Sequence, residues 1–286
     1  MLIAVAQTEP ELAEVARNLE AAIARMEEAA ALGVKLLVLP EAELTGYVFE
    51  SPEEARAAAL EVPGPEVAAL AAAAGRLGLY TVCGLIERAG DLLYNTAVLV
   101  GPATADGEAG PGALLGRYCK THLPFLGVDR FVTPGDEAPV FDTPIGRIGI
   151  EICYDLRFPE LTRSLALQGA DFIAHPTNWP LAATSNAEFI TRTRALENRV
   201  YLLTANRSGT DRGTEFCGWS QICDPSGTRI AETGKAGIAL LVAEADVARS
   251  RDKDIIVIPG EYEMRLWDHR RPELYGAVVA ETIPTT

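Results

Sequence analysis

The chain has 286 residues, of which 48% are hydrophobic and 23% are charged, and its formal net charge is −15. These values are typical of a globular protein that can bury a sizeable core. Nucleic acids and anionic membrane surfaces bind clustered cations, and the chain has no run of Lys and Arg, so we expect neither partner.

The N-terminus lacks the basic start and long apolar stretch of a secretory signal, and no apolar run has the length of a membrane helix. The five cysteines are an odd number without a C-x-x-C pair, which argues against a disulfide framework or a zinc site. The three histidines, His122, His175 and His269, are isolated from one another. We therefore expect a reduced, cytoplasmic enzyme without a metal.

Hydrophobic periodicity predicts alternating strands and helices in the first half of the chain. The predicted elements are a strand at 2–6, a helix at 11–32 that Gly33 ends, a strand at 34–39, a helix at 65–77, and strands at 79–85, 95–100 and 114–120. The run at 34–39 is almost wholly apolar, which is typical of a strand buried on both faces.

The second half repeats this order. Its predicted elements are a strand at 147–152, a helix at 159–168, a strand at 171–175, a helix near 187–197, and strands at 200–205, 218–223, 228–232 and 238–243. Two such layers can pack face to face with their helices outside, which gives a four-layer αββα sandwich of the α/β class. We expect residues 1–286 to form this single domain.

Four predicted strands end in a polar residue. They run into Glu41, Lys120, Cys153 and the segment 177–179, which bears Asn178. In α/β folds, ligands bind at the carboxyl ends of strands, where loops present side chains above a rigid sheet. An acid, an ammonium group, a thiol and an amide at four such ends indicate a single site.

Cys153 lies where a predicted strand turns toward a predicted helix. Such a turn exposes a nucleophile and places backbone N–H groups beside it. A thiolate forms at neutral pH only with help from a base or a cation. Glu41 and Lys120 can supply both, although Glu43 is an equal candidate on local grounds, and His175 leaves a Cys–His pair open.

Three segments carry a resemblance to a known family, namely LVLPEAELTGY (37–47), GRYCKTHLP (116–124) and GRIGIEICYDLRFPEL (146–161). Together with HPTNWP (175–180) and RALENRVYLLTANRSG (194–209), in this order, they resemble the nitrilase superfamily of carbon–nitrogen hydrolases over nearly the whole chain. The resemblance implies an αββα fold, no cofactor, and a homodimer or higher homo-oligomer. It also implies Glu41, Lys120 and Cys153 as the catalytic group.

The residues after Cys153 are similar to the amidase branches, including ω-amidase-like proteins, whereas true nitrilases more often have Trp-Glu there. Many members carry a second glutamate several residues after the lysine. This chain has none at 125–130, and Asp129 is its nearest substitute.

The expected reaction is hydrolysis of a small amide through a thioester on Cys153. Glu41 serves as the base, while Lys120 and the backbone N–H of Tyr154 stabilise the oxyanion. The candidates for the pocket wall are Asn178, Trp179, Tyr47 and Phe125.

Four alternatives stay open: a true nitrilase for small aliphatic nitriles, an N-carbamoyl amidohydrolase, a glutaminase that supplies ammonia to a partner, and a non-catalytic subunit. The segment at about 254–286, with Tyr262 and Trp267, is a candidate contact between subunits.

Overall fold

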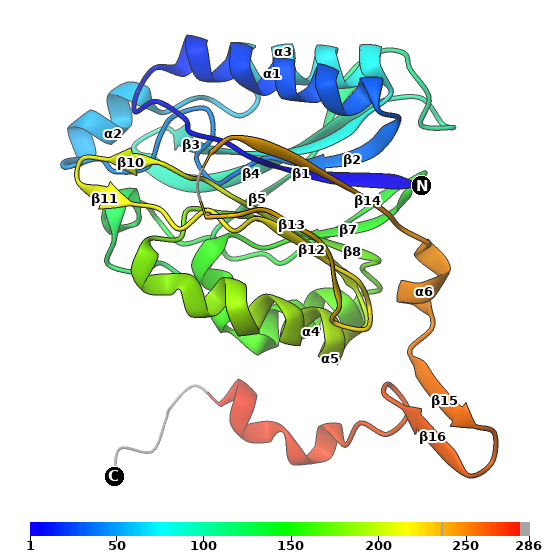
Figure 1. The fold of residues 1–286 in the computed structure, drawn as a ribbon. Coiled ribbons are helices and arrows are strands. Elements are labelled where there is room, and N and C mark those ends of the chain that lie inside the picture. Colours follow the sequence, from blue (N-terminus) through cyan, green and yellow to red (C-terminus); the bar gives the residue numbers. More distant parts are fainter. Residues whose placement is uncertain (236, 281–286) are drawn as a thin grey trace, which may run out of the picture.

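The computed structural model describes residues 1–235 and 237–280. Two six-stranded β-sheets pack face to face, and helices cover the two outer faces (Figure 1). The four-layer αββα sandwich expected from the sequence is therefore confirmed.

The first sheet brings together strands from both ends of the chain. Its spatial order is β14 (Ala239–Glu244), β1 (Leu2–Gln7), β2 (Val34–Val38), β3 (Tyr80–Ala89), β4 (Leu92–Pro102) and β5 (Gly112–Cys119). Its outer face is covered by α1 (Val15–Ala31) and α3 (Pro65–Leu77), while the short helix α2 (Pro52–Ala58) lies at one end of the sandwich (Figure 1).

The second sheet is built from the other half of the chain. Its spatial order is β13 (Arg229–Glu232), β12 (Gln221–Cys223), β9 (Tyr201–Asn206), β8 (Phe172–Thr177), β7 (Gly146–Ile150) and β6 (Val140–Thr143). Helices α4 (Pro159–Leu167) and α5 (Thr191–Asn198) cover its outer face (Figure 1).

Strand β1 shows how the apolar pattern produces these layers. Successive side chains of a strand point to opposite faces. Ile3 and Val5 therefore point into the core between the two sheets, whereas Ala4 and Ala6 pack under the helices on the outer face. Because both faces are covered, the strand is apolar at nearly every position.

Strand β14 belongs to the first sheet, although its sequence follows the strands of the second. It pairs antiparallel with β1, from Leu2 opposite Glu244 to Gln7 opposite Ala239. The prediction counted this strand with the second half of the chain and was wrong in that respect. Its apolar pattern fits either sheet, so only tertiary packing decides which one it joins.

Two predicted helices have different bounds, and several elements have no predicted counterpart. Helix α1 begins at Val15, and the helix expected near 187–197 is a π-helical turn, Asn186–Ile190, followed by α5. The elements that were not predicted include α2, β6, α6 (Val247–Arg251), β15 (Asp254–Ile258) and β16 (Tyr262–Arg265).

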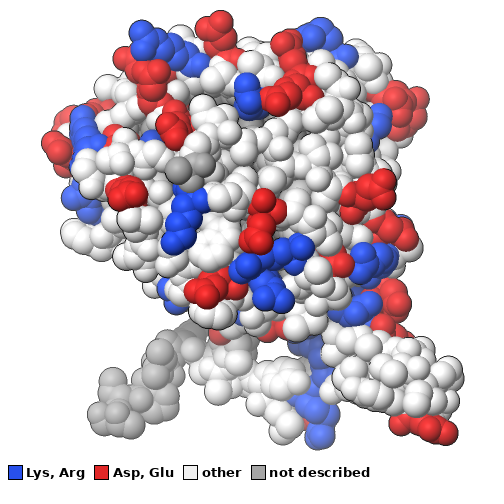
Figure 2. Space-filling view, in the orientation of Figure 1, with Lys and Arg blue, Asp and Glu red and all other residues white. Residues whose placement is uncertain are grey.

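The C-terminal part of the chain leaves the sandwich after α6. The hairpin β15–β16 forms a sheet of its own, and the following segment passes beyond the layer of α4 and α5 (Figure 1). Residues 281–286 of the expected subunit contact lie outside the described residues. Among the described helices, none is both long and apolar enough to cross a membrane. Acidic and basic side chains are interspersed on the face shown in Figure 2.

Candidate active site

Two of the expected catalytic residues follow strands of the first sheet that run in the same direction. Strand β2 is parallel to β3, and β4 is antiparallel to both β3 and β5, so β2 and β5 run in the same direction. Glu41 follows β2 and Lys120 follows β5, which places both at the same edge of the sheet. The sheet geometry therefore brings together residues that are 79 positions apart.

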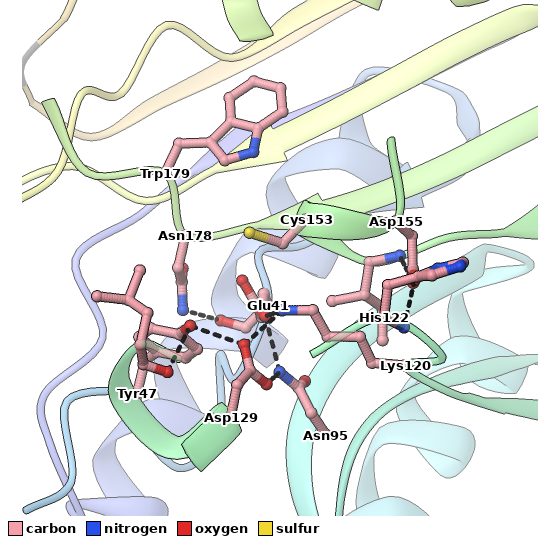
Figure 3. Close-up of polar contacts among 12 residues, drawn as sticks. Glu41, Tyr47, Asn95, Lys120, His122, Asp129, Cys153, Asp155, Asn178 and Trp179 are labelled. Atoms are coloured by element: carbon pink, nitrogen blue, oxygen red, sulfur yellow. Dashed lines mark hydrogen bonds and ion pairs between the residues drawn. The ribbon is translucent and has the colours of Figure 1, made fainter. Parts of the chain in front are cut away.

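Lys120 is completely buried between two carboxylates (Figure 3). Its Nζ lies 2.7 Å from Glu41 Oε1 and 2.6 Å from Asp129 Oδ2. A buried ammonium group is retained only where opposite charges and hydrogen bonds compensate for its lost hydration. The two acids provide that compensation.

Asn95 and Tyr47 complete this polar cluster. Asn95 Nδ2 donates to Glu41 Oε1 at 2.7 Å and to Asp129 Oδ1 at 2.8 Å, and Tyr47 OH donates to Asp129 Oδ2 at 2.8 Å. Glu41 Oε2 is buried and has no hydrogen-bond partner among the described residues. One carboxylate oxygen of Glu41 is thus fixed in place, and the other is left free to exchange a proton.

The backbone around Glu41 is held by a close approach to β3. A Cβ atom at Gly84 would lie 2.5 Å from Ala42 N and 2.6 Å from Glu41 Cα. On the other side, Asn178 Nδ2 donates to the Glu41 carbonyl oxygen at 2.8 Å. Glycine at position 84 is therefore required for the turn that carries Glu41.

Cys153 begins the 3₁₀ turn Cys153–Arg157, between β7 and α4. Its φ of 50° is in the left-handed region, which non-glycine residues occupy at a cost of about 1–2 kcal/mol. His175 Nε2 lies 3.2 Å from the Cys153 carbonyl oxygen and donates to it. The predicted strand-to-helix turn is present, but His175 contacts the backbone of Cys153 rather than forming a Cys–His pair with its thiol.

Burial controls the protonation of the thiol and the carboxyl group. Burial, together with the charge of Glu41, raises the pKa of Cys153 well above its usual value, and the charge of Lys120 opposes this only in part. Burial also raises the pKa of Glu41, against the opposing effect of Lys120. A raised pKa keeps the Cys153 thiol protonated unless a nearby base accepts its proton.

A cleft of about 590 Å³ gives access to Cys153. Its lining residues are Pro124, Leu126, Cys153, Tyr154, Arg157, Phe158, Trp179, Pro180, Ala183 and Asn186.

The structure places the expected pocket residues in different positions. Trp179 and Tyr154 line the cleft, whereas Tyr47 and Asn178 are buried behind it. Phe125, expected in the pocket wall, is 91% exposed instead. Its neighbours Pro124 and Leu126 take that position because the short segment before the turn Gly127–Arg130 directs the Phe125 ring to solvent.

Comparison with known proteins identifies the family to which this site belongs. Residues 2–253 match the family model described as carbon-nitrogen hydrolase. The chain belongs to this family. The resemblance to the nitrilase superfamily is thereby confirmed, and the protein is a carbon–nitrogen hydrolase.

Two curated relatives match most of the chain. A nitrilase of Pyrococcus abyssi is 39% identical over 255 residues, which cover 88% of this chain and 92% of that protein. The omega-amidase NIT2 of Homo sapiens is 30% identical over 273 residues, 91% of each chain.

A solved structure has the same architecture. A mutant of an amidase from Nesterenkonia has a TM-score of 0.75 and 27% sequence identity, with 97% of this chain and 96% of that chain covered. In another mutant of that amidase, an acetamide moiety is covalently attached to the active-site cysteine.

Several residues around the site were not identified from the sequence. Asn95, which contacts two acids of the cluster, lies within the predicted strand region, and its only signal is a polar residue that opens an apolar run. Asp155 and Arg157 were also not identified, and their only signal is that they follow the predicted nucleophile Cys153 closely in the sequence. Within residues 1–235 and 237–280, no group of three or more His, Cys, Asp or Glu side chains is arranged to hold a metal ion.

Proposed function

We propose that this carbon–nitrogen hydrolase cleaves small amides to a carboxylic acid and ammonia or an amine, through a thioester on Cys153. The observation that carries the proposal is the placement of Cys153 on a left-handed turn at a cleft, beside the buried pair of Glu41 and Lys120. The charges of both residues act on the Cys153 thiol. Nucleophile, base and cation are thus within one site.

In the first half of the reaction, Glu41 takes the thiol proton of Cys153 as the sulfur attacks the amide carbon. The carbonyl π electrons move to oxygen, and Lys120 Nζ and the backbone N–H of Tyr154 stabilise the resulting oxyanion. The C–N bond then breaks, and Glu41 donates its proton to the leaving nitrogen. The products of this half are the free amine and a thioester.

In the second half, Glu41 removes a proton from water as the oxygen attacks the thioester carbon. The C–S bond breaks, the acid leaves, and the proton on Glu41 returns to the Cys153 sulfur. The carboxyl group therefore cycles one proton twice per turnover. Its raised pKa supports this role because a base of higher pKa holds the proton more firmly at each transfer.

Asp129 acts through Lys120 in this proposal. Both of its oxygens are occupied, Oδ1 by Asn95 and Oδ2 by Lys120 and Tyr47. A carboxylate so engaged is placed to orient the ammonium group rather than to bind substrate. It therefore takes a different role from the substrate-orienting glutamate that the resemblance led us to look for.

The charge of Arg157 favours a substrate that carries a carboxylate. Among the described residues that line the cleft, it alone carries a charge, and the others are mainly apolar. It ends the 3₁₀ turn that Cys153 begins, and both residues line the same cleft. A short amide bound in this cleft would offer its carbonyl carbon to the thiol and a terminal carboxylate to the guanidinium group.

A nitrile is the second candidate substrate, because the relative from Pyrococcus abyssi is named a nitrilase. The same thiol would add to the nitrile carbon. Ammonia release from neutral amides, amides with a terminal carboxylate, N-carbamoyl compounds and aliphatic nitriles distinguishes the branches. Cys153→Ala and Cys83→Ala, a buried cysteine outside the cleft, serve as the test variant and its control.

We expect activity with at least one amide that Cys153→Ala abolishes and Cys83→Ala retains. Trapping the acyl-enzyme at acid pH should add the acyl mass to the peptide that contains Cys153. Activity that survives in Cys153→Ala would refute the assigned nucleophile. Turnover of nitriles alone would replace amide hydrolysis with the nitrilase reaction.

The Arg157 assignment has its own test. Arg157→Gln should lower kcat/KM for a carboxylate-bearing amide about tenfold relative to a neutral amide of equal length, because one charge-assisted hydrogen bond is lost. Arg157→Lys keeps the charge and should retain most of the preference. Equal losses on both amides would remove Arg157 from substrate recognition.

We also propose that the C-terminal segment contacts a second copy of the chain. The hairpin β15–β16 exposes about half of the surface of Ile256, Val257, Ile258 and Tyr262, and it is mostly white in Figure 2. It extends beyond its own sandwich, so its own chain leaves these side chains uncovered (Figure 1). Light scattering should show a smaller particle for Val257→Glu and no change for Leu92→Glu, an exposed residue on the sandwich.

A further inference from the structure

Asp155 joins the turn that carries Cys153 to the strand that Lys120 follows. Asp155 Oδ2 accepts from the backbone N–H of Ile152 at 2.9 Å and from Tyr118 OH at 2.7 Å. Ile152 follows β7 of the second sheet, whereas Tyr118 lies in β5 of the first. One buried carboxylate oxygen therefore bridges the two sheets directly beside the proposed catalytic residues.

The other oxygen of Asp155 binds the loop after Lys120. Asp155 Oδ1 accepts from Thr121 Oγ1 at 3.0 Å, from the backbone N–H of His122 at 3.0 Å and from His122 Nδ1 at 2.7 Å. Figure 3 shows Asp155 and His122 close to Lys120. Lys120 thus lies between two residues that contact this carboxylate, Tyr118 and Thr121.

A carboxylate suits this position because all of its partners are donors. An ionised Asp offers about four lone-pair sites and no donor. An amide in its place would direct an N–H₂ group at one set of these donors and leave buried polar groups unpaired, at about 1–3 kcal/mol each. The side chain of Asp155 is fully buried, so water cannot replace the lost bonds.

The same bonds position part of the cleft wall. The His122 ring stacks on Phe158 at 3.7 Å between centroids, and Phe158 makes an edge contact with Tyr154 at 5.2 Å. Phe158 and Tyr154 both line the cleft. A shift of His122 would therefore reach the wall next to Cys153.

We propose that Asp155 is a positioning residue that fixes Lys120 and Cys153 relative to each other across the two sheets. This inference rests on the proposed function, because it presumes that these two residues act together on one substrate. Asp155 itself contacts neither substrate nor the reacting atoms. Its effect is on the geometry in which the sulfur, the ammonium group and the substrate meet, where a misplacement of about 1 Å can cost about 100-fold in rate.

The test compares Asp155→Asn with a matched control, Asp171→Asn. Asp171 is also buried and accepts from Arg147 N at 2.9 Å and from Arg251 Nε at 3.0 Å, but it lies at the opposite end of β7 and β8. Both variants remove a buried carboxylate from a segment next to the second sheet. Only Asp155→Asn breaks the link to Lys120.

For Asp155→Asn we expect kcat to fall about 100-fold with a KM within about threefold of wild type, whereas Asp171→Asn keeps kcat within about twofold despite a similar loss in Tm. The rate at which iodoacetamide alkylates Cys153, followed by peptide mass spectrometry, should also differ from wild type only in Asp155→Asn. A wild-type kcat in Asp155→Asn, or equal kcat losses in the two variants, would overturn the proposal.

Tyr118→Phe covers the case in which Asp155→Asn does not fold, since it removes only the bond from β5 to Asp155 and leaves the carboxylate with its other donors. It should lower kcat about tenfold with little change in KM, and an unchanged kcat would contradict the proposal. Cys153→Ala, measured in parallel, distinguishes a failure of the proposed function from a failure of the positioning role of Asp155. Survival of activity in that variant refutes the proposed function, whereas the alkylation assay reports on Asp155 without any substrate.

Discussion

Asp129 and Lys120 form an ion pair from which solvent is wholly excluded, with Asp129 Oδ2 2.6 Å from Lys120 Nζ. The pair connects the 3₁₀ turn Gly127–Arg130 to the end of β5. Because Glu41 is the second partner of the same ammonium group, the charge of Asp129 also affects Glu41, the proposed base. Its presence raises the pKa of Glu41, next to the larger effect of burial.

Replacing Asp129 with Asn should impair both stability and catalysis. Lys120 keeps Glu41 as a partner, but the buried hydrogen bonds that Lys120 and Tyr47 donate to Asp129 are weakened or lost, at about 1–3 kcal/mol. The pKa of Glu41 should fall when the neighbouring negative charge is lost, so Glu41 becomes a weaker base and kcat decreases.

Urea unfolding and steady-state kinetics measure these two effects. The exposed pair of Lys35 and Glu108 provides the control, and Glu108→Gln should cost less than about 1 kcal/mol. An Asp129→Asn variant with wild-type kcat would contradict this account of the cluster.

Gly84→Ala should displace Glu41. The new Cβ would lie within 2.5 Å of backbone atoms of Pro40 and Ala42, which cannot move without shifting the turn between them. We expect a kcat loss of about 100-fold, because the base leaves its position. Gly234→Ala introduces the same methyl group where no atom lies within 4 Å, and it should leave kcat unchanged. Similar kinetics for the two variants would show that the close approach at Gly84 is unimportant.

His175 should support the Cys153 turn through its hydrogen bond rather than its charge. Burial lowers the pKa of His175 to about 4, so the ring is neutral at pH 7. His175→Gln can still donate to the Cys153 carbonyl oxygen, whereas His175→Leu cannot. We expect the Leu variant to lose at least about fivefold more kcat than the Gln variant, since one buried hydrogen bond is worth about 1 kcal/mol. Equal losses would exclude the hydrogen bond as the cause.

The same residue should make the protein sensitive to acid. Between pH 4 and the unperturbed pKa of 6.5, the unfolded state binds a proton at His175 that the folded state does not. Stability therefore rises with pH through this window, by up to about 1.4 kcal/mol per pH unit. Urea unfolding of His175→Gln at pH 5 and pH 7 should show a smaller difference than wild type, and an unchanged difference would contradict the assignment.

Glu151 should have the opposite effect on the pH dependence of stability: the free energy of unfolding should fall as the pH rises. Burial raises the pKa of Glu151 to about 8, and Thr162 is its hydrogen-bond donor. Between pH 4.5 and 8 the folded state holds a proton that the unfolded state has released, so stability falls by about 1.4 kcal/mol per pH unit. Glu151→Gln should therefore be more stable than wild type at pH 8, and the gain should shrink toward pH 4.5.

Unfolding curves across this pH range provide the test of Glu151. Glu27→Gln, on the exposed face of α1, serves as the control and should leave the pH dependence unchanged. If Glu151→Gln and wild type differ by the same amount at pH 5 and pH 8, Glu151 is ionised in the folded protein and the prediction is wrong.

The amino-acid pattern by itself determined the layers and the candidate catalytic group. Runs that are apolar on both faces, such as 34–39, can satisfy their side chains only inside a covered sheet, so the sandwich follows from local sequence. Glu41, Lys120 and Cys153 were candidates because each follows a predicted strand, and the resemblance to the nitrilase superfamily then implied these three as the catalytic group. These signals are short sequence patterns, and they can be recognised without knowing how distant parts of the chain pack.

Only the tertiary structure decided what surrounds those residues. Asn95 and Asp155 are ordinary polar residues in the sequence, and they become informative through partners 54 and 37 positions away, Glu41 and Tyr118. Asp129 was noticed only through the resemblance, and its contact with Lys120 became evident only in the folded chain. The position of β14 beside β1 was likewise decided only by tertiary packing, because the apolar pattern of β14 fits either sheet. A strand pattern specifies which side chains must be buried, but the neighbour that buries them is chosen by the packing of the whole chain.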